Sequence, residues 1–477
     1  MKARTILTGI LAAAAFGVVG AVATTVASPD PAMAASAGSQ LTRSEVLSRA
    51  RHWYYQDPAR YDGGDTSQWM ADVDGGHVYR RDCSGFVSMS LHLTSSPSSF
   101  QLSTSTYGVQ IGWQDLRPGD YLTVDDDGSG GGSDGHVILF ERWAPAYPKF
   151  TYYGFGGTDG QTNSLRHRMG DFNGAATSPL GGSPPQSDDG SNSAGHTDGH
   201  LTSKYKAFRY KNILDNDFAD IDGDGRDEMI SIRPNGDVYA WRNAGNWNGL
   251  TYDGTFKLVA QGFTDASRVR FADIDGDGRD EILNINGNGD VYAYRNIGDW
   301  NSTTYTGTEC KLVAQGFTDA LRTQFADIDG DFRDEILTVN ANGDVVAYRN
   351  IGGWYSNTYS GNVAKIVAYG FTEPTRTQFA DIDGDGTADI IAFYANGDVW
   401  AYRNVGGWTG TTYTGSESKL VAQGFTETTL FGYVDGDGKD EIVAFTGNGN
   451  VWAYLNVGGW LNTTYIGSSS KVLGANF

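Results

Sequence analysis

Two segments of the chain place a thiol and an imidazole where cysteine chemistry would need them. The segment Asp82-Cys83-Ser84-Gly85-Phe86-Val87 is predicted to introduce a helix with Cys83 at its N-terminal end. The free N–H groups and the dipole at that end of a helix favour the thiolate, which is the nucleophilic form of cysteine. Further along, Gly135-His136-Val137 begins a predicted strand. The pair predicts nucleophilic catalysis by Cys83 with His136 as its general base.

The combination is more informative than either residue. A lone cysteine is usually a small core residue, and a lone histidine is usually structural. Here Asp-Cys-Ser-Gly-Phe-Val, then Pro118-Gly119-Asp120, then Gly-His-Val occur in one order and spacing. With these motifs, residues 41–213 resemble the NlpC-type cell-wall cysteine peptidases. The resemblance implies an α+β papain-like domain, with Cys83 as nucleophile, His136 as base and a third polar residue on the next strand, acting on peptidoglycan stem peptides.

The chain departs from that family at the third position. The predicted next strand, Thr151-Tyr152-Tyr153-Gly154-Phe155-Gly156-Gly157, contains no His, Asn, Gln or Glu. Tyr153 is therefore the substitute that we predict. Glu141 lies five positions after His136, so strand alternation is expected to point it to the opposite face.

Two further residues and one missing motif leave the activity open. His167 and Asn163 are alternatives for the third position, but the sequence does not place them. The aromatic-Gly-Gly segment that usually precedes the cysteine is replaced by Val78-Tyr79-Arg80-Arg81. The sequence thus allows either an active hydrolase or a degenerate peptidase domain.

The elements that carry these residues follow from periodicity and turn signals. Thr42 and Glu45 form a capping-box pattern before apolar residues at helical spacing, which predicts a first helix reaching Tyr54. A second helix is predicted from Cys83 towards Leu93. Strands are predicted at 120–124, 136–143, 150–155 and 204–210. The stretch 170–203 is rich in Gly, Ser, Pro and Asp and is predicted to be a mobile low-complexity loop.

The chain is repetitive from about residue 218. The segment Phe-Ala-Asp-Ile-Asp-Gly-Asp begins at Phe218, Phe271, Phe325 and Phe379, with a degenerate copy at Phe431, at intervals of 53, 54, 54 and 52 residues. Each copy leads into a short apolar strand, an Asn-Gly hairpin turn and a strand of the form Gly-Asp-Val-x-Ala-Tyr-Arg-Asn. Five such units over residues 214–477 predict an all-β, five-bladed propeller closed into a ring.

Each repeat opens with a loop of carboxylates around a tight turn. Acidic residues at loop positions 1, 3, 5 and 9 supply the hard oxygen ligands that Ca²⁺ prefers. One copy would fit an ordinary turn equally well, but four full copies would repel strongly without a cation. Phe332 replaces the turn glycine of the third loop, and Tyr433 replaces the first ligand of the fifth, where we expect weak binding or none. The predicted ligands are Asp220, Asp222, Asp224, Glu228, Asp273, Asp275, Asp277, Glu281, Asp327, Asp329, Asp331, Glu335, Asp381, Asp383, Asp385, Asp389, Asp435, Asp437 and Glu441.

These loops resemble the FG-GAP or VCBS repeats over roughly 260 residues. The resemblance implies a β-propeller with structural Ca²⁺ in its blade loops, although such propellers usually have more than five blades. Every repeat also carries a Trp five residues before a Tyr, which suits either sugar stacking or packing between blades. The pairs are Trp247/Tyr252, Trp300/Tyr305, Trp354/Tyr359, Trp408/Tyr413 and Trp460/Tyr465.

Composition and the N-terminal segment indicate the compartment. Residues 1–34 are typical of a secretory signal, because Lys2 and Arg4 precede an uncharged apolar run and Ala32-Met33-Ala34 forms a cleavage site. No other segment is predicted to span a membrane. The formal charge of −22 excludes an electrostatic footprint for nucleic acid. Cys83 and Cys310 lie in unrelated surroundings and are predicted to be free thiols.

The sequence therefore predicts a secreted or cell-wall-associated hydrolase. It would cleave an amide bond of the peptidoglycan stem peptide by a Cys–His mechanism, as an endopeptidase or an amidase. The calcium-binding propeller would anchor it to peptidoglycan or another cell-wall glycan. The alternative is a non-enzymatic, Ca²⁺-dependent adhesin or lectin with a degenerate peptidase domain. The missing third residue favours the alternative, and the intact Cys and His segments favour the enzyme.

Overall fold

A computed structural model of the chain describes most of the residues after the predicted signal. The predicted signal, Asn163 and most of the predicted loop 170–203 lie outside the described residues. No helix in the described part is long and apolar enough to cross a membrane. The described residues are 37–55, 69–73, 75–125, 135–143, 149–156, 165–171, 196–198, 200–245, 247, 251–340, 342–356, 358–372, 376–394, 396–425, 428–445, 450–460 and 464–475.

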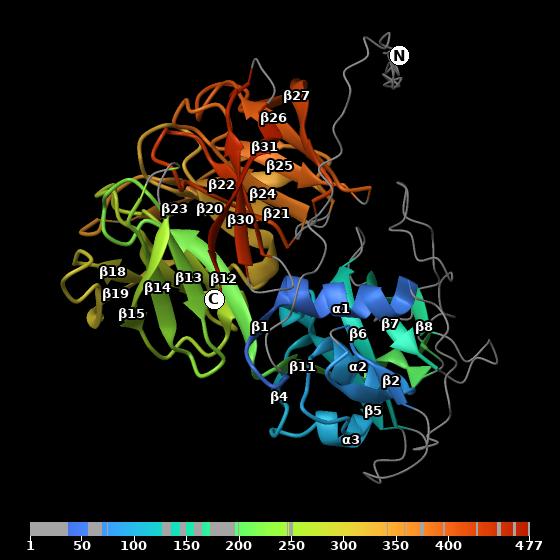
Figure 1. The fold of residues 1–477 in the computed structure, drawn as a ribbon. Helices are drawn as coiled ribbons and strands as arrows, with labels where there is room; N and C mark the ends of the chain where they lie inside the picture. Colours follow the sequence, from blue (N-terminus) through green and yellow to red (C-terminus); the bar gives the residue numbers. More distant parts are fainter. Residues whose placement is uncertain are drawn as a thin grey trace, which may run out of the picture.

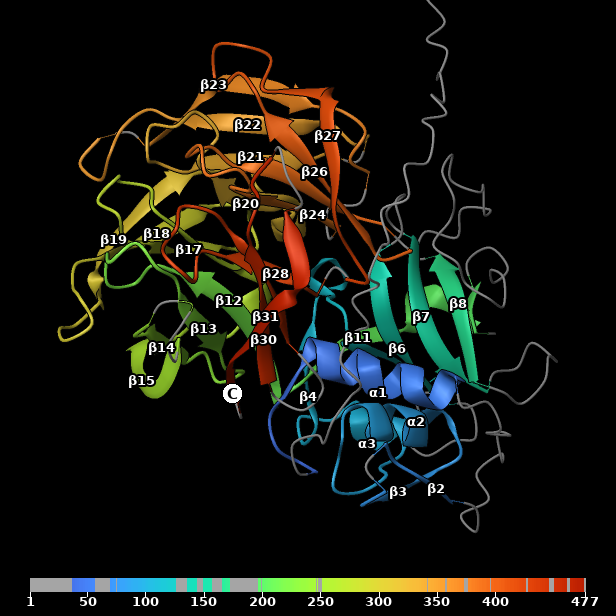
Figure 2. The same ribbon diagram turned by 45° about the horizontal axis from the view of Figure 1, so that its top comes forward.

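The N-terminal region, residues 37–212, is built on one antiparallel sheet of six strands (Figure 1). Helices α1 (Arg43–Tyr55) and α2 (Cys83–Ser90) contribute to one core cluster on this sheet, and a second cluster covers the other face. Figure 2 shows the two helices together beside β6, β7 and β8. The strands, in spatial order, are β4 (Gly108–Ile111), β11 (Lys206–Tyr210), β5 (Tyr121–Asp125), β6 (Gly135–Trp143), β7 (Lys149–Phe155) and β8 (Leu165–Asp171).

Alternation along the central strand divides the two cores. Val137 and Leu139 of β6 belong to the cluster that includes the helices, whereas Ile138 and Phe140 belong to the opposite cluster. Smaller elements complete the region. These are α3 (Ser99–Leu102), the hairpin of β2 (Trp69–Ala71) and β3 (Val78–Arg80), the pair β9 (His196–Thr197) and β10 (His200–Leu201), and the 3₁₀ turns η1 (Trp113–Asp115) and η2 (Thr202–Lys204).

The repeat region, residues 213–475, contains five antiparallel sheets of four repeat strands each. The short strand β1 (Leu41–Thr42) pairs in parallel with β12 and joins the first of these sheets. The strands are β12 (Ile213–Ala219), β13 (Glu228–Ile232), β14 (Val238–Asn243) and β15 (Tyr252–Ala260); β16 (Val269–Ala272), β17 (Glu281–Ile285), β18 (Val291–Asn296) and β19 (Tyr305–Ala314); β20 (Thr323–Ala326), β21 (Glu335–Val339), β22 (Val345–Asn350) and β23 (Tyr359–Ala368); β24 (Thr377–Ala380), β25 (Asp389–Phe393), β26 (Asp398–Asn404) and β27 (Tyr413–Gln423); and β28 (Leu430–Gly432), β29 (Glu441–Phe445), β30 (Asn450–Asn456) and β31 (Tyr465–Ala475).

Backbone hydrogen bonds join each sheet to the next through the acidic loops. The N–H of loop position 8 donates to the carbonyl of position 1 in the preceding repeat, as from Asp280 to Asp220 at 2.8 Å. The same bond recurs between the later repeats. It also runs from Asp227 in the first repeat to Tyr433 in the fifth, again at 2.8 Å. A backbone hydrogen bond therefore also joins the fifth sheet to the first.

The repeated tryptophans lie at these junctions. Trp354 is 8% exposed, and the Lys311 ammonium of the preceding repeat donates to its carbonyl at 2.6 Å. Lys311 and Arg295 both lie over the Trp354 ring, with 5.5 and 5.6 Å to its centroid. Lys471 makes the equivalent contact with Trp247, between the fifth repeat and the first. The structure agrees with the packing interpretation of the Trp positions.

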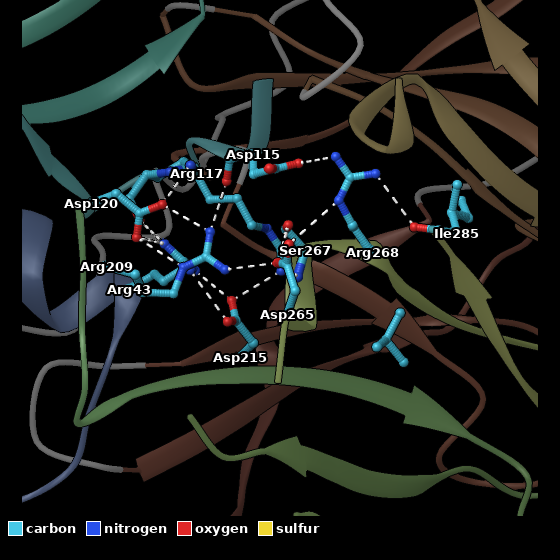
Figure 3. Close-up of polar contacts among 12 residues, drawn as sticks. Arg43, Asp115, Arg117, Asp120, Arg209, Asp215, Asp265, Ser267, Arg268 and Ile285 are labelled. Carbon is cyan, nitrogen blue, oxygen red and sulfur yellow. Dashed lines mark hydrogen bonds and ion pairs between the residues drawn. The ribbon is translucent and has the colours of Figure 1, made fainter. Parts of the chain in front are cut away.

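Buried ion pairs join the N-terminal region to the first two repeats (Figure 3). Asp120, fully buried, accepts from Arg43 at 3.0 Å and from Arg209 at 2.9 Å. Arg43 also bonds Asp215 of β12 at 2.5 Å, and Arg209 bonds Asp265 between β15 and β16 at 3.2 Å. Burial would raise the pKa of Asp215, but neighbouring guanidinium groups outweigh it and hold that pKa well below its usual range. The two regions are thus coupled through paired charges, most of which are buried.

We predict that Asp120→Asn lowers the free energy of unfolding by about 3–5 kcal/mol, because Arg43 and Arg209 would keep their buried charges without their shared carboxylate. Chemical denaturation of the full chain measures the change. The matched control is Asp319→Asn, which breaks a pair whose carboxylate is 36% exposed and should cost at most about 1 kcal/mol. Equal effects of the two substitutions would contradict the role given to Asp120.

Candidate active site and metal-binding loops

The N-terminus of α2 is fixed by its capping residue. Asp82 accepts hydrogen bonds from the Gly85 N–H at 2.7 Å and from the Ser84 hydroxyl at 2.8 Å, and Arg80 pairs with it at 3.1 Å. These contacts hold the first turn in place. Cys83, the first helical residue, is 6% exposed. It is a free thiol, as predicted.

His136 contacts both the thiol and a carboxylate. It lies near the start of β6, interacts electrostatically with Cys83, and places Nε2 2.7 Å from Oδ2 of Asp198. The ring of His200 stacks on His136 with 5.3 Å between centroids. The three side chains form a Cys–His–Asp series in which the carboxylate orients the imidazole and the imidazole faces the thiol.

The surroundings of His136 favour its charged form. Burial lowers its pKa, but the electrostatic interaction with Cys83 and the hydrogen bond to Asp198 outweigh burial and raise the pKa to about 10. A charged imidazolium beside a cysteine favours the thiolate form of that cysteine.

Asp198 reaches His136 because β7 leaves room for it. A Cβ atom added to Gly154 would lie 2.6 Å from Asp198 Oδ2, so a larger residue there would collide with the carboxylate. Asp198 is fully buried and has a φ of +52°. Arg166 and Arg168 of β8 stand 3.9 and 4.0 Å from its other oxygen. The third polar group, Asp198, therefore lies in the short turn between β9 and β10. Its carboxylate lies beside Gly154 of β7, the strand predicted to carry the third residue.

Tyr153, which the sequence predicts as the third catalytic residue, contacts Glu141 and His167. Its hydroxyl donates to Glu141 at 3.3 Å, and its ring stacks on His167 at 4.6 Å, while Asp198 takes the place beside His136. Glu141 accepts from His167 Nε2 at 2.7 Å. Burial would raise the pKa of Glu141, but the bond from His167 and nearby arginines hold it well below its usual range. Tyr153, Glu141 and His167 thus form a separate buried cluster.

The acidic loops bring carboxylates together in each complete repeat. In the first three repeats the ligand oxygens at positions 1, 3 and 9 lie within 4.8 Å of one another, and these groups could hold a metal ion. In the fourth repeat the group consists of positions 1, 3 and 5 instead. The named groups are Asp220, Asp222 and Glu228; Asp273, Asp275 and Glu281; Asp327, Asp329 and Glu335; and Asp381, Asp383 and Asp385.

The carboxylate at position 3 shows that these loops fit a cation. The side chains of Asp222, Asp275, Asp329 and Asp383 are only 6, 4, 2 and 4% exposed. Oδ2 of each pairs with an arginine, Arg242, Arg295, Arg349 or Arg403, and Oδ1 of each is buried without a hydrogen-bond partner. A buried carboxylate oxygen without a partner is costly, and a hard cation among these ligands would satisfy it. Sequence analysis missed these arginines, although each occurs in the repeated Tyr-Arg-Asn or Trp-Arg-Asn segment.

Position 5 depends on its neighbour at position 7. Asp277 pairs with Arg279 at 2.7 Å, and the first and third loops contain the same pair. In the fourth loop Thr387 stands at position 7, and Asp385 joins the carboxylate group. In the fifth loop Asp437 pairs with Lys439. Among the four groups named above, only that of the fourth repeat therefore includes the predicted ligand at position 5, Asp385.

Comparison with known proteins identifies the repeats. Residues 220–284 and 327–392 match the FG-GAP-like repeat family, and these two segments contain the four complete acidic loops. The chain thus contains FG-GAP-like repeats, as the loop motif predicted. No curated protein matches the chain.

Two solved structures show weak similarity. One is an Agrocybe aegerita lectin that recognises non-reducing terminal N-acetylglucosamine, with 19% identity, a TM-score of 0.34, and coverage of 75% of this chain and 90% of the lectin. The other is the Photorhabdus luminescens Tc holotoxin pore, with 16% identity, a TM-score of 0.31, and coverage of 68% of this chain and 13% of the toxin. At these TM-scores neither likeness bears on fold or function.

We predict that Asp198→Asn lowers the pKa of His136, because the amide cannot supply the carboxylate's charge. Imidazole NMR should place the wild-type titration near pH 10. Since that pKa exceeds the ordinary 6.5, charged His136 stabilises the folded state below pH 6.5 and loses this effect as the pH rises towards 10. The stability difference between wild type and His136→Gln should shrink across this window. An unchanged pKa in Asp198→Asn would contradict the contact.

We also predict that chelated protein loses stability as the pH rises from 4.5 to about 9. Burial, reinforced by Asp275, raises the pKa of Glu281 from 4.5 to about 9, and the equivalent Glu335 also rises to about 9. The folded state therefore holds protons that the unfolded state releases, and stability declines across that range. Bound Ca²⁺ should stabilise the ionised carboxylates and thereby reduce the dependence of stability on pH. Melting scans with chelator and with Ca²⁺ test this, and identical profiles would exclude cation binding by the loops.

Proposed function

We propose that the N-terminal region is a cysteine hydrolase that cleaves an amide bond of the peptidoglycan stem peptide. The observation that carries the proposal is that His136 bonds Asp198 and interacts electrostatically with Cys83. Nucleophile, base and orienting carboxylate, each on a different element, are the set that acyl transfer through a thioester needs. The order of the Cys and His motifs supports a papain-like, NlpC-type domain, and the choice of wall peptide follows from that resemblance.

In the proposed reaction the Cys83 thiolate attacks the amide carbonyl carbon and forms a C–S bond. The N–H of Cys83, at the first turn of α2, would donate to the developing oxyanion. His136 gives its proton to the amide nitrogen, and the C–N bond breaks to release the amine. His136 then takes a proton from water, whose oxygen displaces the thiolate and yields the carboxylic acid. Asp198 holds the ring through Nε2, which leaves Nδ1 for the proton transfer.

We further propose that the five sheets are the blades of a β-propeller with structural Ca²⁺ in its complete loops. The bond from the first repeat to the fifth supports closure, and the unpartnered oxygen at position 3 supports the cation. The residues at positions 1, 3 and 9 would hold Ca²⁺ in the first three loops, and those at positions 1, 3 and 5 would hold it in the fourth. Bound Ca²⁺ would neutralise the buried carboxylates. The propeller would attach the hydrolase to peptidoglycan or another cell-wall glycan after export.

Digestion of purified peptidoglycan, with mass spectrometry of the fragments, tests the activity. We expect wild type to release peptide fragments, and Cys83→Ala and His136→Ala to release none. Cys310→Ala is the matched control, because Cys310 is an exposed thiol on β19 and should be dispensable. The fragment masses would also separate endopeptidase from amidase cleavage.

The same experiment separates the enzyme from a Ca²⁺-dependent adhesin or lectin. The low exposure of Cys83 and His136, 6 and 4%, is the observation that favours the non-enzymatic alternative. Sedimentation of the protein with wall material, with Ca²⁺ and with chelator, measures binding independently of cleavage. Wall binding without fragments from wild type would refute the hydrolase and favour the adhesin.

A further inference from the structure

We propose that Asp72, His77 and His92 bind a transition-metal ion of the Zn²⁺ class. This cluster lies outside the Cys83 site and outside the acidic loops. One ligand atom from each residue lies within 4.8 Å of the other two. Two imidazoles with one carboxylate form a ligand set that suits Zn²⁺ rather than Ca²⁺, which takes oxygen ligands. A fourth position would remain for water.

The distance between two of the three proposed ligand atoms agrees with the ligand-to-ligand distance of a tetrahedral site. His92 Nε2 and Asp72 Oδ2 are 3.4 Å apart, and bonds of about 2.0–2.1 Å at tetrahedral angles give an edge of about 3.3–3.4 Å. The His77 and His92 rings meet edge to face, with 6.1 Å between centroids. His92 is 4% exposed and Asp72 5% exposed, so two of the three ligands are withdrawn from water.

The backbone holds these ligands on three separate elements. Asp72 follows β2, His77 precedes β3, and the Asp72 N–H donates to the His77 carbonyl at 2.9 Å across the hairpin. His92 follows α2 with a φ of +47°, a conformation that non-glycine residues seldom adopt. A bound ion would therefore tie the β2–β3 hairpin to the end of α2. Because β3 leads through Arg81 and Asp82 into Cys83, the ion would help position both ends of the helix that carries the thiol.

Arg49 of α1 competes with the ion. Its Nη2 lies 3.0 Å from His92 Nδ1, and it also pairs with Glu45 at 3.4 Å. Since Arg only donates, the metal-free His92 carries its proton on Nε2. Metal binding at Nε2 would move the proton to Nδ1 and turn Arg49 towards Glu45. Glu45 and Asp72 together offset the charge of Arg49, which leaves the cluster net negative and suited to a dication.

Co²⁺ titration tests the site, because tetrahedral Co²⁺ has a visible absorption that octahedral Co²⁺ lacks. The mature chain would carry Cys83→Ala and Cys310→Ala, so that no thiol binds the probe, and saturating Ca²⁺ would occupy the acidic loops. We expect one equivalent of tetrahedral Co²⁺, displaced by Zn²⁺. In this background His77→Gln should weaken Co²⁺ binding by roughly a hundredfold. Loss of a direct ligand should cost at least as much as loss of a residue that only hydrogen-bonds to a ligand.

Two further variants decide the interpretation. His52→Gln, which changes a histidine of α1 outside the cluster, should bind Co²⁺ as the parent does. Arg49→Gln should bind it at least as tightly, because the competing guanidinium is removed. Melting temperatures in Ca²⁺ confirm that each variant is folded. The proposal would be overturned if the parent protein gave no tetrahedral Co²⁺ signal, or if the parent and His77→Gln bound Co²⁺ equally. Neither result bears on wall hydrolysis by the unmodified protein.

Discussion

The constraint on which most of the structure depends is that its many buried carboxylates must each be matched by a positive charge or by donors. A carboxylate withdrawn from water is costly unless it is paired and hydrogen-bonded. The chain meets this demand in different ways. Asp120 is shared by two guanidinium groups, Glu141 accepts from His167, and Asp198 accepts from His136. The acidic loops use backbone N–H groups and arginines, and this pairing leaves one oxygen of position 3 for a cation.

The sequence predicted what depends on local pattern. Repetition with Asn-Gly turns predicts the hairpins of the repeats, and the helix that starts at Cys83 and the strand that starts near His136 occur as expected. These features follow from periodicity and capping, which act over a few residues. The FG-GAP-like character of the loops could also be predicted, because the spacing of their ligands lies within nine residues.

The partner of His136 could not be predicted in this way. Asp198 lies 62 residues from His136, in a segment whose composition resembles a loop. Only the fold brings the two together. The signal nearest to it was Gly154, since a glycine inside a strand often marks a close approach by another group. Gly154 has no side chain, and this absence leaves the space on β7 that the Asp198 carboxylate occupies.

The acidic loops also differ among themselves in a way that charge explains. In each of the first three repeats, four carboxylates face two arginines, one at position 7 and one on the third strand. In the fourth, Thr387 replaces the first of these, so four carboxylates face Arg403 alone. The fifth repeat loses a carboxylate at Tyr433 and also the strand arginine, where Leu455 stands. With three carboxylates and Lys439, the fifth loop therefore has the same formal excess of negative charge as each of the first three loops. The fourth loop carries the greatest excess of negative charge and gathers Asp385 into its group, so its demand for a cation is the strongest of the five.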